Sequence, residues 1–530
     1  MSPSTAIGLA IALPLLGAVG IQLTGSRPNL REAVTIITSL LTFAVVLTLY
    51  PVVTGLAPHN RPELELLTVL PGVALAFQVE PLGMLYALVA AGLWIPTGLY
   101  AIGYCRGHDE QNQTRFFTCF ALAIFAALGI AFARNLFTLF LFYEILTLST
   151  YPLVTHYGND DAKAAGRTYL GILLTTSVLF LLMAILWTWN LTGTMEFKLG
   201  GILAGKAEGP VVAALLALYA FGTGKAALMP FHRWLPAAMV APTPVSALLH
   251  AVAIVKAGVF TVLKIIVYVF GIDLLGRSGA SDWLMWAAAF TLLSSSVIAL
   301  SKDNLKARLA YSTISQLSYI VLGGALATAA GILGGGLHIA MHAMGKITLF
   351  FCAGAIFVAS HKKNISDMDG IGRAMPFTMG AFFLGSMSII GLPPMGGSWS
   401  KWYLAMGAAD GNNAIIIAVL MISSLLSIGY LMPVVGRAFL FPPKVSEHSH
   451  GEHGHGEHGH SEHGHGEHGH GPISAWLARI FPGFHEAPLL CVAPLCVTAI
   501  GCILLFFYAE DIYNLLLPIT QSAPAVTVER

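Results

Sequence analysis

The sequence predicts an all-α polytopic membrane protein with about fourteen transmembrane helices. Of its 530 residues, 56% are hydrophobic and only 10% are charged. Soluble chains carry roughly 25% charged residues, so this chain lacks the charge to cover a water-facing surface. Apolar runs near the ~20 residues needed to cross a bilayer occur from end to end. They are helices rather than barrel strands, because barrel strands are short segments of alternating polarity.

The apolar runs define the positions of the spans in order along the chain. We expect them at 5–24, 34–55, 82–104, 115–133, 135–156, 168–189, 210–230, 246–270, 283–301, 308–329, 335–358, 375–394 (continuing past a break to about 409), 413–436 and 488–508. The first run has no basic n-region and no small-residue cleavage site, so it is expected to be a retained span rather than a signal peptide.

The distribution of basic residues tests this count. Loops after odd-numbered spans hold sixteen Lys and Arg residues, whereas the opposite side holds six. The positive-inside rule therefore predicts that the odd loops are cytoplasmic and that both termini lie outside.

The remaining basic residues fall inside or at the ends of spans. They are Lys225, Lys256, Lys264, Lys346 and Lys401. Among the acidic residues, only Glu144 is expected to lie well inside a span. An ionisable group in a bilayer costs a few kcal/mol even on lenient scales, so such a group is retained only when it is paired or used. Lys264 lies near a span end, from which it could extend to the interface.

Two spans contain helix-breaking residues next to a lysine. The seventh contains "YAFGTGKAALMPFHRWLP", with glycines before Lys225 and a proline after it, and the twelfth ends in "SIIGLPPMGGSWSKWYL" before Lys401. Irregular backbone at membrane depth persists only where it is buried or lines a wet cavity. Two such breaks five spans apart predict two inverted five-helix repeats, a common plan for transport pathways. Simple proline kinks are the alternative.

This reasoning divides the chain into five parts. They are helices 1–3 (1–110), a first repeat of helices 4–8 (111–271), a second repeat of helices 9–13 (283–440), a His-rich cytoplasmic loop (441–475) and helix 14 with the tail (476–530).

The intramembrane charges suggest proton transfer. We expect Glu144 and Lys225 to form an ion pair, in which a change at the carboxylate would release the lysine proton; a static salt bridge is the alternative. His250 and Lys256 follow in the eighth span. In the eleventh span, "HIAMHAMGKITLFF" places His338, His342 and Lys346 on one helix face, about one turn apart.

Imidazole groups with interposed water can pass protons, because one ring nitrogen accepts while the other donates. A zinc site is disfavoured, since no carboxylate or cysteine accompanies the two histidines and Lys346 would repel a cation. Nearby polar side chains could orient the water: Thr223, Ser246, Ser312, Thr313, Ser315 and Gln316.

Residues 446–470 form a low-complexity tract of five EH-x-H-x pentads. Its glycine content predicts a polar, unfolded loop. It could bind zinc or nickel loosely, buffer protons or serve only as a linker. The weak metal candidates are His448, His450, His453, His455, His458, His460, His463, His465, His468 and His470.

Several functional classes lack support in the sequence. No Walker A loop, dinucleotide fingerprint, haem or iron–sulfur cysteine pattern or zinc-peptidase motif is present. The net charge of +1 gives no indication of a nucleic-acid partner, and the six cysteines show no CxxC pair. We therefore expect no cofactor and no catalytic centre in this chain; an ion gradient or a redox partner in other chains must supply the energy.

Several segments together resemble the antiporter-like subunits of respiratory complex I, membrane-bound hydrogenases and Mrp-type cation/proton antiporters. The matching stretches are "FYE" at Glu144, residues 222–260 ("GTGKAALMPFHRWLPAAMVAPTPVSALLHAVAIVKAGVF"), 305–323 ("LKARLAYSTISQLSYIVLG"), "HIAMHAMGKITLFFCAGAI" and "GLPPMGGSWSKWYL". The resemblance implies fourteen helices with the seventh and twelfth broken.

The resemblance also implies a role for each ionisable residue. Glu144 and Lys225 correspond to the fifth-helix glutamate and seventh-helix lysine of the input half. His250 and Lys256 correspond to connecting groups. The series His338, His342 and Lys346 matches proton-path positions, and Lys401 matches the terminal group.

Within the family, the chain is most similar to the Mrp D-type subunit. The lysine at 401 differs from the glutamate usual in M-type complex I subunits. The implied function is proton translocation within an Mrp-type Na⁺(K⁺)/H⁺ antiporter, with sister antiporter-like subunits as partners, in the cytoplasmic (inner) membrane of a prokaryote. A redox-driven M-type or hydrogenase subunit, and so part of a translocase, is the second reading. A stand-alone divalent-metal transporter is the third, supported only by the His-rich tract.

Overall fold

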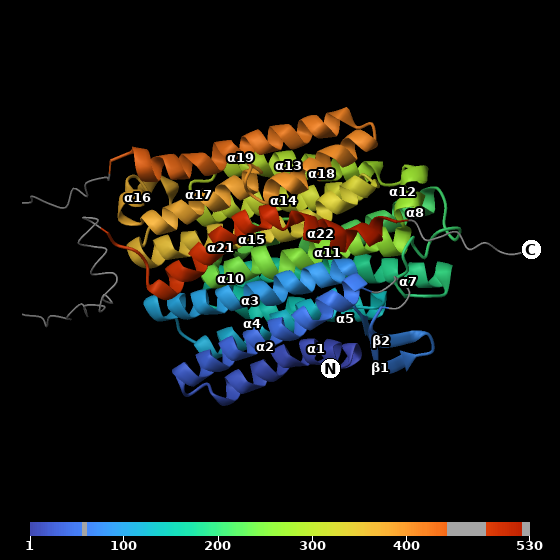
Figure 1. The fold of residues 1–530 in the computed structure, drawn as a ribbon, viewed down its shortest axis with the longest axis horizontal. Helices are drawn as coiled ribbons and strands as arrows, with labels where there is room; N and C mark the ends of the chain where they lie inside the picture. Colours follow the sequence, from blue (N-terminus) through green and yellow to red (C-terminus); the bar gives the residue numbers. More distant parts are fainter. Residues whose placement is uncertain (56–60, 443–483, 522–530) are drawn as a thin grey trace, which may run out of the picture.

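The computed structural model describes residues 1–55, 61–442 and 484–521 as a bundle of long helices that run side by side (Figure 1). The ten histidines of the 446–470 tract lie outside the described residues, so the structure does not bear on their predicted roles.

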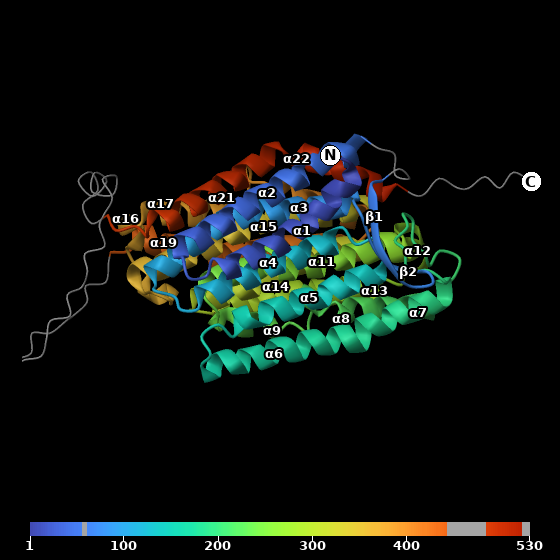
Figure 2. The ribbon, with the colours of Figure 1, turned by 90° about the horizontal axis from the view of Figure 1, so that it is seen from below.

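The first half of the chain begins with two helices, a β-hairpin and a run of further helices. The bounds are α1 Pro3–Leu23, α2 Pro28–Gly55, β1 Glu63–Leu70, β2 Val73–Gln78, α3 Pro81–Gly107, α4 Gln113–Ala131, α5 Leu136–Val154, α6 Asp160–Thr176, η1 Ser177–Leu181, α7 Leu182–Thr192, α8 Pro210–Gly222, η2 Gly224–Ala226, α9 Trp234–Ala237, η3 Ala238–Val240, α10 Thr243–Ala247, η4 Leu248–Val252, α11 Ile254–Ile265 and η5 Ile266–Phe270. Figure 2 shows α6, η1 and α7 as one long helix along an edge of the bundle.

The second half follows the same helical plan. The bounds are α12 Ile272–Ser278, α13 Asp282–Ser301, α14 Leu305–Ala325, α15 Ala329–Ser360, η6 Ile365–Asp367, α16 Ile371–Ala374, α17 Pro376–Ile390, α18 Gly397–Asp410, α19 Ala414–Leu440, α21 Leu489–Phe507, α22 Ala509–Leu516 and η7 Leu517–Thr520.

The helices account for the predicted spans. Within the described residues, eleven helices are long and apolar enough to cross a membrane. The other three predicted spans correspond to the short helix α8, the more polar α14, and α17 with α18. The predicted fold class of a polytopic helical membrane protein is confirmed.

Both predicted helix breaks are present. After α8, the chain passes through η2, which contains Lys225, and Ala227 adopts a φ of +56°. After α17, Gly391 adopts a φ of +89° before α18 begins at Gly397. Only a residue that tolerates left-handed backbone ends a helix this way at low cost, which explains the glycine at 391.

The β-hairpin is an element that the all-helical prediction missed. Strands β1 and β2 pair antiparallel, and Gly72 supplies the positive φ of the Pro-Gly turn between them. The signal lies in "ELELLTVLPGVALAFQ", two β-branched and apolar segments around a turn dipeptide. The hairpin extends from the end of the bundle opposite α16 (Figure 1).

The core of the bundle consists of α10–α11 and α15. The hydrophobic window of Thr243–Phe270 is entirely buried, and α15 contacts α3, α10, α14, α17, α18 and α21. Helices in a bilayer pack through small residues, because lipid offers no hydrophobic drive for association. Accordingly, α15 and α18 touch at two glycines, where a Cβ on Gly407 would lie 2.4 Å from the Gly331 nitrogen.

Candidate proton-transfer site

Lys256 on α11 and His342 on α15 form the centre of the site. A hydrogen bond joins Lys256 Nζ to His342 Nδ1, and both side chains are buried. A charged lysine can only donate, so Nδ1 accepts and the ring proton then lies on Nε2. That nitrogen is buried and has no hydrogen-bond partner among the described residues.

His338 lies one turn from His342 and has a partner for each ring nitrogen. Its ring stacks on that of His342 with centroids 5.8 Å apart. Nε2 lies 3.1 Å from Gln316 Oε1, and Nδ1 lies 2.8 Å from Ser400 Oγ. An amide oxygen can only accept, so Nε2 donates to it.

Ser400 can satisfy His338 in both protonation states. Its hydroxyl also lies 3.1 Å from the Gly397 carbonyl oxygen. When the imidazole is neutral, Ser400 can donate to Nδ1. When it is charged, Nδ1–H donates to Ser400, which turns its own proton to Gly397. The start of α18 therefore offers His338 a hydrogen-bond partner whether the imidazole is neutral or charged.

Lys401, the residue after Ser400, is held at the break between α17 and α18. Its ammonium group donates to the carbonyl oxygen of Ile390, the last residue of α17, at 2.9 Å and to Ser424 Oγ at 3.0 Å. It also lies 4.8 Å from the centre of the Tyr319 ring. No carboxylate pairs with it among the described residues.

Lys346 does not continue the histidine series, although it shares their helix face. Its Nζ donates to Ser312 Oγ at 2.6 Å and to the Leu309 carbonyl oxygen at 3.3 Å, both on α14. The eleventh-span series thus divides: His342 pairs with α11, His338 bridges α14 and α18, and Lys346 bonds to α14.

The predicted ion pair between Glu144 and Lys225 is wrong as a direct contact. Lys225 Nζ donates instead to the Tyr143 carbonyl oxygen at 2.9 Å and to Thr147 Oγ1 at 2.6 Å, and it lies over the Tyr143 ring. The residues that bind it are therefore one position before and three positions after Glu144 on α5. Both carboxylate oxygens of Glu144 are buried and lack a hydrogen-bond partner among the described residues.

The turn that carries Lys225 and the helix that carries Lys256 pack directly against each other. A Cβ on Gly258 would lie 2.3 Å from the Lys225 carbonyl carbon, so α11 rests directly on the turn that holds this lysine. No hydrogen bond links Lys225 to Lys256 in the described part of the chain. His250, on η4, is fully buried against Phe350, and neither ring nitrogen has a partner among those residues.

Lys264 is buried, so the expectation that it extends to the interface is wrong. Its Nζ lies 3.3 Å from Glu80 Oε1 and donates to the Ala133 carbonyl oxygen. Glu80 also accepts from the Tyr268 hydroxyl and from two backbone N–H groups at the start of α3. Sequence reasoning missed Glu80; the acidic residue directly before Pro81 is a typical helix N-cap signal.

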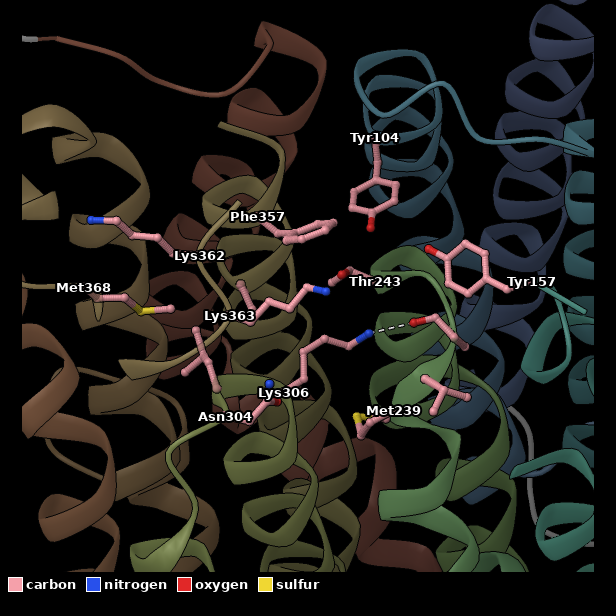
Figure 3. A pocket seen from close by; sticks show the side chains of 14 residues that line it. Tyr104, Tyr157, Met239, Thr243, Asn304, Lys306, Phe357, Lys362, Lys363 and Met368 are labelled. Carbon is pink, nitrogen blue, oxygen red and sulfur yellow. Dashed lines mark hydrogen bonds between the residues drawn. The ribbon is translucent and has the colours of Figure 1, made fainter. Parts of the chain in front are cut away.

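A cavity of about 200 Å³ opens near the start of α10, at the end of the bundle that bears the basic loops. Figure 3 shows the side chains that line it. Lys306 Nζ donates to the Ala241 carbonyl oxygen at 2.6 Å, and the ammonium group of Lys363 points toward Thr243 (Figure 3). His250 lies seven residues beyond Thr243 along the same helical segment.

Comparison with known proteins places this arrangement in a family. The family described as NADH:quinone oxidoreductase/Mrp antiporter, TM, matches residues 133–427. The chain is 35% identical over 366 residues to NADH-quinone oxidoreductase subunit N of Desulforudis audaxviator, a match that covers 68% of this chain and 72% of that one. It is 31% identical over 346 residues to NAD(P)H-quinone oxidoreductase chain 5 of Synechocystis sp., about half of whose length it spans.

Solved structures share the fold over nearly the whole chain. A chain of the Mrp complex from Dietzia sp. DQ12-45-1b aligns with a TM-score of 0.82 at 23% identity, covering 98% of this chain and 97% of that one. A chain of the membrane-bound sulfane sulfur reductase, an archaeal respiratory membrane complex, aligns with a TM-score of 0.79, also at 23% identity, and covers 97% of both. The family match over residues 133–427 covers more than half of the chain and contains all the predicted proton-transfer positions. Together with the 35% identity to subunit N, it shows that the chain belongs to the NADH:quinone oxidoreductase/Mrp antiporter family of membrane subunits.

Proposed function

We propose that this chain translocates protons as a subunit of a multisubunit membrane complex of the Mrp cation/proton antiporter type. The observation that carries the proposal is the buried row of polar contacts between the two broken helices. Lys256 bonds to His342, His342 stacks on His338, and His338 bonds to Ser400 beside Lys401. Each group in this row can both receive and release a proton or reorient a hydroxyl.

The proposed proton-transfer groups are those expected from the sequence. They are Glu144, Lys225, His250, Lys256, His338, His342, Lys346 and Lys401. Water must complete the row between Lys225 and Lys256, because no side chain joins them. The cavity beside Lys306 gives polar access to α10 from the side with the basic loops, which we assign to the cytoplasm of a prokaryotic cell.

The hydrogen-bond partners of His338 and His342 favour proton transfer over metal binding at these histidines. His338 and His342 are bonded to an amide, a serine and a lysine, and a lysine ammonium would repel a cation. Within the described residues, no group of three or more His, Cys, Asp and Glu side chains is placed to hold a metal.

The two repeats and the topology belong to the same proposal. The helix breaks at η2 and Gly391 occupy comparable positions in residues 111–271 and 283–440, which supports an inverted pair of repeats.

We propose that both termini lie on the outside of the membrane. Labelling intact cells with an impermeant maleimide tests this: Thr68→Cys in the hairpin should react and Lys163→Cys should not. The reverse pattern would invert the topology.

A redox-driven pump is the second candidate, and the 35% identity to a quinone oxidoreductase subunit favours it. Purification of the intact complex with identification of its chains separates the two. The antiporter proposal expects no flavin or iron–sulfur subunit and a proton flux that starts when Na⁺ or K⁺ is added to energised everted vesicles. Co-purifying redox subunits and a flux that requires an electron donor would overturn it.

Lys401→Ala should stop this flux, because it removes the group at the end of the row. Lys163→Ala, at an exposed lysine, is the control. Unchanged flux in Lys401→Ala would show that protons do not pass through this position.

A further inference from the structure

One side of α19 carries hydroxyl groups that are not part of the proposed row from Lys256 through His342 and His338 to Ser400. They are Ser423, Ser424, Ser427 and Tyr430, spaced so that they lie on the same side of the helix. Ser423, Ser427 and Tyr430 are fully buried, whereas Met421 and Leu425 on the other side are 65% and 66% exposed, as expected of a lipid-facing surface. The polar side therefore faces α13, α14 and α18.

The hydroxyl row begins at Lys346. Lys346 Nζ donates to Ser312 Oγ at 2.6 Å, and Ser312 Oγ donates to the Tyr430 hydroxyl at 2.9 Å. Ser427 Oγ lies 2.9 Å from the same tyrosine oxygen. Three consecutive hydrogen bonds thus lead from a buried lysine on α15, across α14, to the middle of α19.

The other end of the row lies at Lys401. Lys401 Nζ donates to Ser424 Oγ at 3.0 Å, and the Tyr319 hydroxyl lies close to Ser423 and Ser424. Ser424 and Ser427 are three residues apart, a separation of about 5 Å along the helix that one water molecule can bridge.

We propose that the hydroxyl groups of α19 form a second proton connection from Lys346 to Lys401, parallel to the route through His342 and His338. This inference rests on the proposed function and names further residues for it. It also explains why Lys346 bonds to Ser312 rather than continuing the histidine series.

The transfer balances without an ionised tyrosine. Lys346 gives a proton to Ser312, which passes its own hydroxyl proton to Tyr430; Tyr430 passes one to Ser427, and a bridging water and Ser424 pass one to neutral Lys401. Each oxygen gains one proton and loses one, so the net change is one proton moved from Lys346 to Lys401. The hydroxyls then rotate back to their starting direction.

A second cluster of buried hydroxyl groups in the same protein shows what a purely structural role would look like. Ser296 on α13 lies 2.8 Å from Ser315 Oγ and 3.4 Å from Ser423 Oγ. This cluster joins α13 to α14 and α19 through buried hydroxyl groups, and within the described residues Ser296 has no hydrogen bond to a lysine. Removing the Ser296 hydroxyl should affect helix packing as much as removing the Tyr430 hydroxyl, but it should not interrupt a connection between lysines.

The test measures proton flux by the intact complex in everted vesicles for Tyr430→Phe, Ser427→Ala and the control Ser296→Ala, each alone and combined with His338→Leu. Size-exclusion profiles of the purified complexes establish assembly. We expect His338→Leu to retain part of the flux and the Tyr430→Phe combination to lose it. The Ser427→Ala combination should lose flux as the Tyr430→Phe combination does, whereas the Ser296→Ala combination should match His338→Leu alone.

Three results would overturn the second connection. They are complete loss of flux in His338→Leu alone, equal flux in His338→Leu with and without Tyr430→Phe, and equal losses from Ser296→Ala and Tyr430→Phe. Failure of the proposed function is recognised separately, because the wild-type complex would then show no cation-dependent proton flux at all.

Discussion

Lys256 and His342 meet directly, Nζ to Nδ1, across the interface of α11 and α15. The contact joins the eighth predicted span to the eleventh, and it makes a lysine in the first half of the chain the partner of a histidine in the second half. Because the pair is buried, each group depends on the other for its hydrogen bonding, and this dependence can be measured.

His342→Leu should lower proton flux to the part that the second connection carries, and it should destabilise the protein. The substitution leaves the Lys256 ammonium group buried without its partner, and an unsatisfied buried donor costs about 1–3 kcal/mol, or more when it is charged. Thermal melting and vesicle flux measure the two effects. The double variant Lys256→Met with His342→Leu should recover stability but not flux. A double variant as unstable as the single one would contradict the pairing.

Glu144→Gln should leave the protein folded and assembled but stop coupled transport. The glutamine keeps the shape of a side chain whose oxygens accept no hydrogen bond in the described chain, so little packing is lost. It removes the ability to ionise, which the proposed mechanism requires. Glu208→Gln, at an exposed loop position, is the control. Wild-type flux in Glu144→Gln would exclude this carboxylate from proton transfer.

Gly258→Ala should reduce flux without changing any polar group. The new methyl would lie 2.3 Å from the backbone of Lys225 and Ala226, so η2 and α11 must separate and the lysine must move. Gly171→Ala on α6 is the matched control, because a Cβ there has no heavy atom within 4 Å. Equal flux in the two alanine variants would show that the packing of α11 on η2 does not set the position of Lys225.

Lys264→Met should lower the thermal stability strongly. Removing one partner of a buried ion pair typically costs about 3–5 kcal/mol, since the other charge stays buried. The effect should appear as a lower melting temperature of the purified complex. Adding Glu80→Gln should restore part of the loss, because the remaining side chain is then neutral and can still accept from Tyr268. An unchanged melting temperature in Lys264→Met would show that the pair adds nothing to stability.

Those features of this protein that depend on local composition could be predicted from the amino-acid sequence. Fourteen spans, two breaks beside Lys225 and Lys401, and the family to which the chain belongs followed from apolar length, from proline and glycine, and from short motifs. These features are local because a bilayer requires each crossing segment to satisfy its own backbone hydrogen bonds.

Which polar side chains meet depends on how the helices pack, and the sequence could not predict it. The spacing of His338, His342 and Lys346 placed them on one helix face, but it could not show that His342 bonds to α11, His338 to α14 and α18, and Lys346 to α14. In the same way, Lys225 bonds to Tyr143 and Thr147 rather than to Glu144, because η2 packs against the face of α5 that carries those two residues. Partners inside a bundle are set by how helices rotate and cross, and that geometry is absent from the pattern along any single helix.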